Sequence, residues 1–253
     1  MLQLLIGFFI AVIIALSGVG AGVVTAPLLI LFLHVPVEIA VSTALAYAAI
    51  VKLIVVPVQM WRKQVNYRIL WWMLLGGLPG VILGSLFFRH VALHGPKSLL
   101  YIVLGSIIIF SSGWQLLRHF RPDAITRPTT DRPKWIALLT FPIAAEVGFS
   151  SSGAGALGTV ALLGLTSLTA AQVVGTDLTF GLGLSVVGTG IHMIGGVYDG
   201  PLLWKLAIGG VFGALAGSGV APRIPNRQLR LALSLWLLFI GFQFVYQALF
   251  PHH

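Results

Sequence analysis

Long apolar stretches dominate the chain, and two of them are too long for a single membrane helix. Residues 2–33 contain no charged residue, and a straight helix of that length would extend roughly 48 Å at 1.5 Å per residue. The hydrocarbon core of a bilayer is only about 30 Å thick. Residues 135–168 form a second stretch of this kind, interrupted by Glu146 and three serines. Each stretch carries a Gly-rich sequence near its middle, at residues 17–22 and 150–155, so we expect both helices to break there.

Eight hydrophobic segments follow one another along the chain. Most have the length of about 20 residues that a membrane-spanning helix needs. They are continuous apolar runs and lack the alternation of a membrane β-barrel. The sequence therefore predicts an all-α polytopic membrane protein. The segments are residues 2–33, 39–60, 69–88, 98–120, 135–168, 170–194, 202–220 and 228–250.

The second half of the chain repeats the first at a fixed offset of 133 residues. Matched glycine, tryptophan and threonine positions are hard to explain by chance similarity between apolar segments. We therefore expect a first membrane repeat at residues 1–120, a cytoplasmic linker at 121–134 and a second membrane repeat at 135–253. The matched pairs include Gly20 with Gly153, Thr43 with Thr176, Asn66 with Asp199, Trp71 with Trp204, and Gly76, Gly80 and Gly84 with Gly209, Gly213 and Gly217.

The loop charges distinguish two arrangements of these repeats. If all eight segments cross once, nine basic residues lie inside and five outside. If each broken segment instead turns back at its Gly-rich middle, each repeat crosses three times and the two repeats are inverted. Eleven basic residues then lie inside and three outside, namely Arg89, Lys97 and Lys205. The positive-inside rule favours these inverted repeats with re-entrant first helices. An eight-crossing arrangement with kinked segments stays open.

Composition agrees with a chain that has the bilayer as its solvent. Of 253 residues, 58% are hydrophobic and 8% charged, whereas soluble domains carry about 25% charged residues. We expect a multi-pass protein of the cell (inner) membrane, and the apolar start of the chain does not resemble a cleaved signal peptide. The net charge of +9 comes from basic residues in short loops, so no nucleic-acid partner is expected. With no cysteine, neither disulfides nor a thiolate metal site can form, and no metal or cofactor is expected.

The two Gly-rich breaks are the candidate substrate site. A helix that breaks within the membrane frees backbone N–H groups, and an anion at a helix N-terminus satisfies them. Glycine permits close approach of the backbone to a ligand, and serine and threonine add hydroxyl groups. Paired breaks in two halves of a chain are a pointer to a transporter site. The expected substrate-binding residues are Ser17, Gly18, Gly20, Gly22, Thr43, Lys52, Ser151, Ser152, Gly153, Gly155 and Thr176.

Few ionisable residues lie within the predicted spans, and such residues are functional candidates in a membrane. Lys52 would attract an anion. Asp177 and Glu146 are the candidate proton-coupling groups, although Asp177 could equally be a cation ligand or a structural carboxylate. Glu146 would pair with Lys52 or with a backbone group. His192 is equivalent to Gln59 in the repeat, and an interfacial hydrogen bond is the expected role of both.

Two motifs that suggest enzymes do not fit their surroundings. Residues 153–158 match G-x-G-x-x-G, but the dinucleotide-binding motif follows a strand in a soluble βαβ unit. Ser151 and Ser152 lack the G-x-S-x-G context of a serine nucleophile and a histidine placed to activate it. No enzymatic activity is expected.

In the order and spacing of its motifs the chain resembles the TauE/SafE sulfite-exporter family, also called the toluene-sulfonate uptake permeases. The resemblance implies a secondary transporter of small sulfur-containing anions such as sulfite, sulfoacetate or other organosulfonates. Proton coupling and alternating access are expected, and a homodimer is one open oligomeric state. A passive anion channel and a non-transporting membrane scaffold are the alternatives. The motifs are Ser17–Gly22 followed by Pro27-Leu28, Val41-Ser42-Thr43, Val65-Asn66-Tyr67, Gly153-Ala154-Gly155 and Val174-Gly175-Thr176-Asp177.

Overall fold

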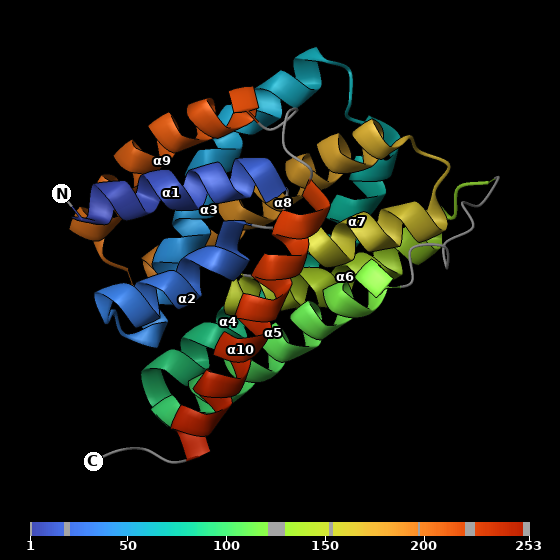
Figure 1. The fold of residues 1–253 in the computed structure, drawn as a ribbon. Coiled ribbons are helices and arrows are strands. Elements are labelled where there is room, and N and C mark those ends of the chain that lie inside the picture. Colours follow the sequence, from blue (N-terminus) through green and yellow to red (C-terminus); the bar gives the residue numbers. More distant parts are fainter. Residues whose placement is uncertain are drawn as a thin grey trace.

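A computed structural model describes residues 2–17, 21–120, 130–151, 154–196, 198–220 and 226–249, and these residues form ten helices and no strand (Figure 1). The all-α prediction is therefore confirmed. The helices are α1 (Leu2–Ser17), α2 (Ala21–Leu33), α3 (Val37–Trp61), α4 (Tyr67–His94), α5 (Lys97–Phe120), α6 (Pro133–Ser150), α7 (Ala154–Leu165), α8 (Ala170–Ile194), α9 (Gly200–Val220) and α10 (Asn226–Leu249).

The two overlong apolar stretches break where the Gly-rich sequences occur. The first divides into α1 and α2, and the second into α6 and α7. At the end of α6, Ser151 adopts a left-handed backbone with φ of 60°, and its N–H donates to the carbonyl of Val147 at 2.8 Å. A left-handed residue is a common way to end a helix, although glycine is usual there.

The chain turns back on itself at the second break. The N–H of Arg132, just before α6, donates to the carbonyl of Leu165 at the end of α7 at 3.0 Å. A carboxylate oxygen of Asp131 also accepts hydrogen bonds from the backbone and hydroxyl of Ser167, at 2.9 and 3.0 Å. The two ends of the broken segment thus lie side by side. Figure 1 shows α2 likewise running back from the end of α1.

Six helices of the described chain are long and apolar enough to cross a membrane. They are α3, α4, α5, α8, α9 and α10. None of the four helices beside the breaks is among them. This is the set of spans expected if each broken segment enters the membrane and returns.

The helices pair across the two halves of the chain. Helix α4 packs along α6, and α1 packs along α9. Glycines make both contacts close: a Cβ on Gly76 would overlap the carbonyl oxygen of Ala137, and a Cβ on Gly209 would overlap that of Leu4. Both partners of the first contact lie 133 residues from their counterparts in the second. Close glycine-mediated packing of this kind is common between membrane helices.

Two further contacts obey the same offset. Asn66 caps α4 by accepting from the N–H of Ile69 at 3.1 Å. Asp199 accepts from the N–H of Leu202, at the start of α9, at 2.9 Å. Such side chains satisfy N–H groups that have no partner within the first turn of a helix. The beginnings of α4 and α9 therefore share one local device.

Helices α3 and α8, which the offset makes equivalent, run antiparallel. Near the start of α3, Ser42 Oγ lies 2.9 Å from Nδ1 of His192 near the end of α8. Further along α3, Lys52 Nζ lies 3.1 Å from Oγ of Ser185, which comes earlier in α8. Helices α5 and α10 show the same order in the contacts Tyr101–Phe244 and Gln115–Ser234.

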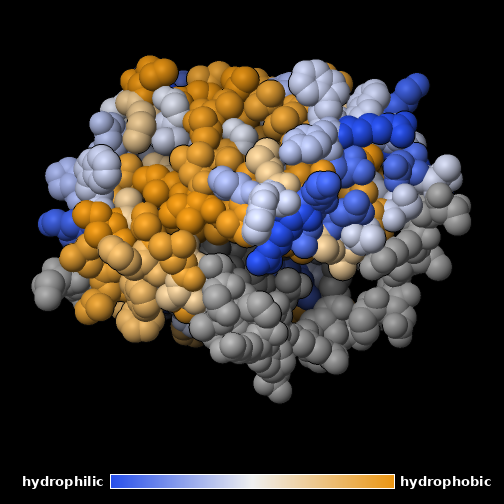
Figure 2. All heavy atoms as spheres, turned by 90° about the horizontal axis from the view of Figure 1, so that it is seen from above, coloured by the Kyte–Doolittle hydropathy of each residue, from blue (hydrophilic) through white to orange (hydrophobic). Residues whose placement is uncertain are grey.

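Large apolar side chains occupy the outer surface as well as the core. The core contains fully buried rings such as those of Tyr47, Phe88 and Phe180, while Phe110 and Phe239 are more than 60% exposed. Figure 2 shows hydrophobic side chains over much of one face, with hydrophilic ones gathered toward one side. Exposed apolar surface on this scale is what a lipid-embedded protein presents.

Candidate functional site

The second break places a hydroxyl without a partner inside the protein. Ser151 is 4% exposed, and its Oγ has no hydrogen-bond partner among the described residues. Buried hydroxyls are nearly always hydrogen-bonded, so an unpaired one suggests a missing partner. The preceding Ser150 is bound locally, because its hydroxyl donates to the carbonyl of Glu146 at 2.9 Å. Ser151 is therefore available to a ligand at the break.

Lys52 is a cation enclosed within the helix bundle. It is 7% exposed, and its ammonium donates to the carbonyl of Gly181 and the hydroxyl of Ser185, both at 3.1 Å. These partners lie on α8, so Lys52 does not pair with Glu146. An ammonium has three N–H donors, and the third has no acceptor in the described part of the chain. The offset of 133 makes Lys52 and Ser185 equivalent, so this contact joins corresponding positions of the two halves.

Asp177 lies on α8 one turn before Gly181 and carries the opposite charge. It is 5% exposed, and its Oδ2 accepts from Thr159 Oγ1 of α7 at 3.0 Å. Its Oδ1 has no hydrogen-bond partner among the residues described and lies against Gly158, whose Cβ, if present, would overlap it. Lys52 and Asp177 are close enough to attract each other electrostatically. A buried charge is tolerated only where such partners offset its loss of hydration.

The two equivalent threonines are used differently. Thr176 accepts a hydrogen bond from the N–H of Asn66 at 3.0 Å, which ties α8 to the start of α4. Thr43 is fully buried, and its Oγ1 has no partner among the described residues. Of this predicted pair, only Thr43 has a hydroxyl free to bind a ligand.

The first break lies largely outside the described residues. Gly18, Gly20, Ser152 and Gly153 are not described, so their predicted roles stay predictions. Ser17, Gly22 and Gly155 lie in the helices that flank the breaks, with only their backbone described. Glu146 is partly buried in α6. No cluster of three or more potential metal ligands occurs in the part of the chain that the structure describes.

The structure adds His192, to which sequence analysis gave only an interfacial hydrogen bond. The imidazole is 2% exposed and lies in the protein interior, bound to Ser42 and to the carbonyl of Gly148. Its position near the end of an apolar segment suggested the surface. A lone polar residue in that place gives no signal of the helix packed over it.

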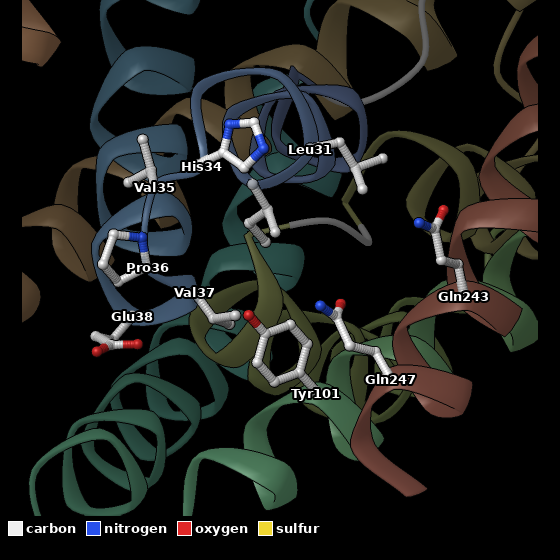
Figure 3. A pocket seen from close by; sticks show the side chains of 10 residues that line it. Leu31, His34, Val35, Pro36, Val37, Glu38, Tyr101, Gln243 and Gln247 are labelled. Atoms are coloured by element: carbon white, nitrogen blue, oxygen red, sulfur yellow. The ribbon is translucent and has the colours of Figure 1, made fainter. Parts of the chain in front are cut away.

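A pocket of about 460 Å³ opens where α2 turns into α3 (Figure 3). Its polar side chains are Glu38, Tyr101, Gln243, Gln247 and His34, and they come from α3, α5, α10 and the short turn. Figure 3 shows Tyr101 and Gln247 pointing toward the space beneath the turn. The sequence did not reveal this pocket, because its walls come from segments more than 60 residues apart.

Comparison with known proteins agrees with the resemblance seen in the sequence. The family described as "Sulfite exporter TauE/SafE" matches residues 3–244. The chain is 28% identical to "Probable membrane transporter protein YjnA" of Bacillus subtilis (strain 168), over 96% of this chain and 98% of that protein. It is 26% identical to "Probable membrane transporter protein YdhB" of the same organism, over 93% and 96% of the two chains. No solved structure matches.

The family match spans nearly the whole chain and agrees with an all-helical fold containing six candidate membrane spans. The chain is a multi-pass membrane protein that belongs to the TauE/SafE sulfite exporter family.

Proposed function

We propose that the protein is a secondary transporter of small sulfur-containing anions, such as sulfite, sulfoacetate or other organosulfonates. The observation that carries this proposal is the enclosed ammonium of Lys52, with an N–H donor unused by the described residues. The unpartnered hydroxyls of Ser151 and Thr43 add two further buried groups that can donate. Sulfur oxyanions offer several acceptor oxygens for such donors. The family description names sulfite, which supports this substrate class.

The packing of the two halves supports inverted repeats. A two-fold axis perpendicular to the helices turns each helix into an antiparallel copy of itself. The equivalent helices α3 and α8 run antiparallel, as do α5 and α10. Three crossings in each repeat produce the same inversion. Repeats of this kind let one half rock against the other around a fixed central site, which gives alternating access.

The inverted topology predicts opposite sides for two positions. The chain has no cysteine, so single substitutions Gln3→Cys and Thr130→Cys can be labelled without background. We expect a membrane-impermeant maleimide to label Gln3→Cys in intact cells and Thr130→Cys only after permeabilisation. The reason is that eleven basic residues then lie inside. Labelling of both positions from one side would contradict the inverted arrangement.

Asp177 is the proposed proton-coupling residue, with Glu146 as a second candidate. A buried carboxylate with one oxygen unpaired among the described residues can be stabilised by binding a proton. Its attraction to Lys52 changes when the carboxylate is neutralised. Proton binding would thus alter the charge that an anion meets in the site.

Asp177→Asn should separate transport from its driving force. We expect a pH gradient to drive uptake in the wild type and to have no effect in the variant. Exchange of labelled for unlabelled anion should continue in both. Asp199→Asn is the matched control, because Asn66 caps the equivalent helix in the same manner. If the pH gradient still drives Asp177→Asn, Asp177 is not the coupling group.

Flux of labelled sulfite into proteoliposomes tests the proposed function itself. A transporter gives saturable uptake that a pH gradient accelerates. An anion channel gives flux that does not saturate and follows the membrane potential alone. A scaffold protein gives no flux above protein-free vesicles, and this result would refute the proposal.

A further inference from the structure

His192 joins three helices at the outer side of the second break. Its Nδ1 lies 2.9 Å from Oγ of Ser42 on α3, and its Nε2 lies 3.1 Å from the carbonyl oxygen of Gly148 on α6. The imidazole stacks on the ring of Phe88 from α4, with centroids 4.8 Å apart. Only 2% of the residue is exposed. An ionisable ring in such surroundings is unusual in a membrane protein, where intramembrane ionisable residues are commonly functional.

The partners of the imidazole accommodate both of its charge states. The carbonyl of Gly148 can only accept, which assigns the Nε2 proton. Ser42 can donate to Nδ1 when the ring is neutral. Its hydroxyl also lies 3.0 Å from the carbonyl of Glu38, so after proton uptake it can donate there and accept from Nδ1–H. One hydroxyl rotation then keeps every group hydrogen-bonded.

The position of Gly148 favours the charged form. Gly148 lies in the last turn of α6, where the partial negative charge of a helix end stabilises a cation. The break follows three residues later, at residues 151–153. A stronger hydrogen bond from an imidazolium to Gly148 would hold the end of α6 against α3 and α8. Proton binding at His192 would therefore act on the geometry of the break.

The pocket beneath the α2–α3 turn brings polar surface close to this group. Glu38 lines the pocket and lies one helical turn before Ser42. The charged side chains of the surrounding helices are Glu38 on α3, Arg89 on α4 and Glu146 on α6, while Asp177 lies further along α8 beside Lys52. In the inverted topology the turn and the pocket face the outside.

We propose that His192 is a proton-binding site served from the outer pocket, and that its protonation state sets the conformation of the break through Gly148. The inference rests on the proposed function for its role in transport. It adds a proton site distinct from Asp177, which lies four turns earlier on α8.

The first test follows the imidazole itself by ¹⁵N NMR of histidine-labelled protein in nanodiscs. His192→Gln identifies the resonance, and glutamine suits the position because the equivalent residue is Gln59. We expect the His192 signal to change from a neutral tautomer to the doubly protonated form as the pH falls from about 8 to about 4.5. A signal that stays neutral throughout this range overturns the proposal. This measurement needs no substrate, so it stands even if sulfite is not transported.

The second test compares flux at different outer pH values. The ratio of wild-type to His192→Gln flux should change at least about threefold over the same range, because a histidine titrates there and glutamine does not. His90→Gln, which removes an exposed imidazole of α4, should leave the ratio constant. A constant ratio for His192→Gln would overturn the role in transport. Absence of flux in the wild type would refute the proposed function and leave the NMR result to decide the proton site.

Discussion

Lys52→Gln lowers the uptake of sulfite at low concentration by about 10- to 100-fold, if the enclosed ammonium binds the anion. A hydrogen bond to a charged group contributes about 1.5–3 kcal/mol, and each ~1.4 kcal/mol is a factor of ten in affinity. Glutamine keeps a polar side chain that can donate to the carbonyl of Gly181. The loss therefore measures the charge more than the packing. The measurement is the concentration dependence of initial uptake into proteoliposomes.

Two controls locate the effect at Lys52. Lys205→Gln removes an exposed lysine of α9 and should leave uptake unchanged. Ser185→Ala removes one acceptor of the Lys52 ammonium but keeps the charge, so its effect should be much smaller. If Lys52→Gln transports as well as the Lys205→Gln control, the anion is bound elsewhere.

Gly76→Leu and Gly209→Leu each prevent stable folding. A Cβ at either position would overlap a backbone carbonyl oxygen, that of Ala137 or that of Leu4. The neighbouring helix must then move away, because backbone cannot rotate aside as a side chain can. Overpacking usually costs about 1–3 kcal/mol and sometimes more, and we expect at least about 3 kcal/mol here. Thermal unfolding of the purified protein, followed by monodispersity on gel filtration, measures the loss.

Gly190→Leu is the matched control for both variants. Gly190 lies in α8 with no atom within 4 Å of a Cβ, so the same substitution meets open space. Its unfolding temperature should stay within a few degrees of the wild type. Equal losses at positions 76, 190 and 209 would show that glycine matters for helix conformation and not for the contacts across the two halves.

The sequence predicted the breaks because a length argument applies to them. Residues 2–33 and 135–168 exceed the thickness of the bilayer core, and only the Gly-rich sequences offer a place to interrupt the helix. The fixed offset of 133 also predicted which helix starts are equivalent, as the caps at Asn66 and Asp199 illustrate. Membrane helices are thus accessible to prediction when length and periodicity determine them.

The contacts between helices were not accessible in this way. Nothing in the sequence places Gly148 beside His192, because apolar helices carry little information about which face meets which neighbour. Lys52 was recognised from its charge, yet its partners Gly181 and Ser185 were not. The offset could have suggested Ser185, since equivalent residues near a two-fold axis must approach each other. Glu146, chosen for its charge, does not bind Lys52.

The most direct measurement of the central claim is the position of a bound oxyanion. Selenite has the shape and charge of sulfite, and its selenium gives an anomalous signal in a crystal of the protein. The account predicts a difference peak in contact with Nζ of Lys52 and the break after Ser151. A peak only in the outer pocket beside Tyr101 and Glu38, or apolar side chains filling the space next to Lys52, would contradict it.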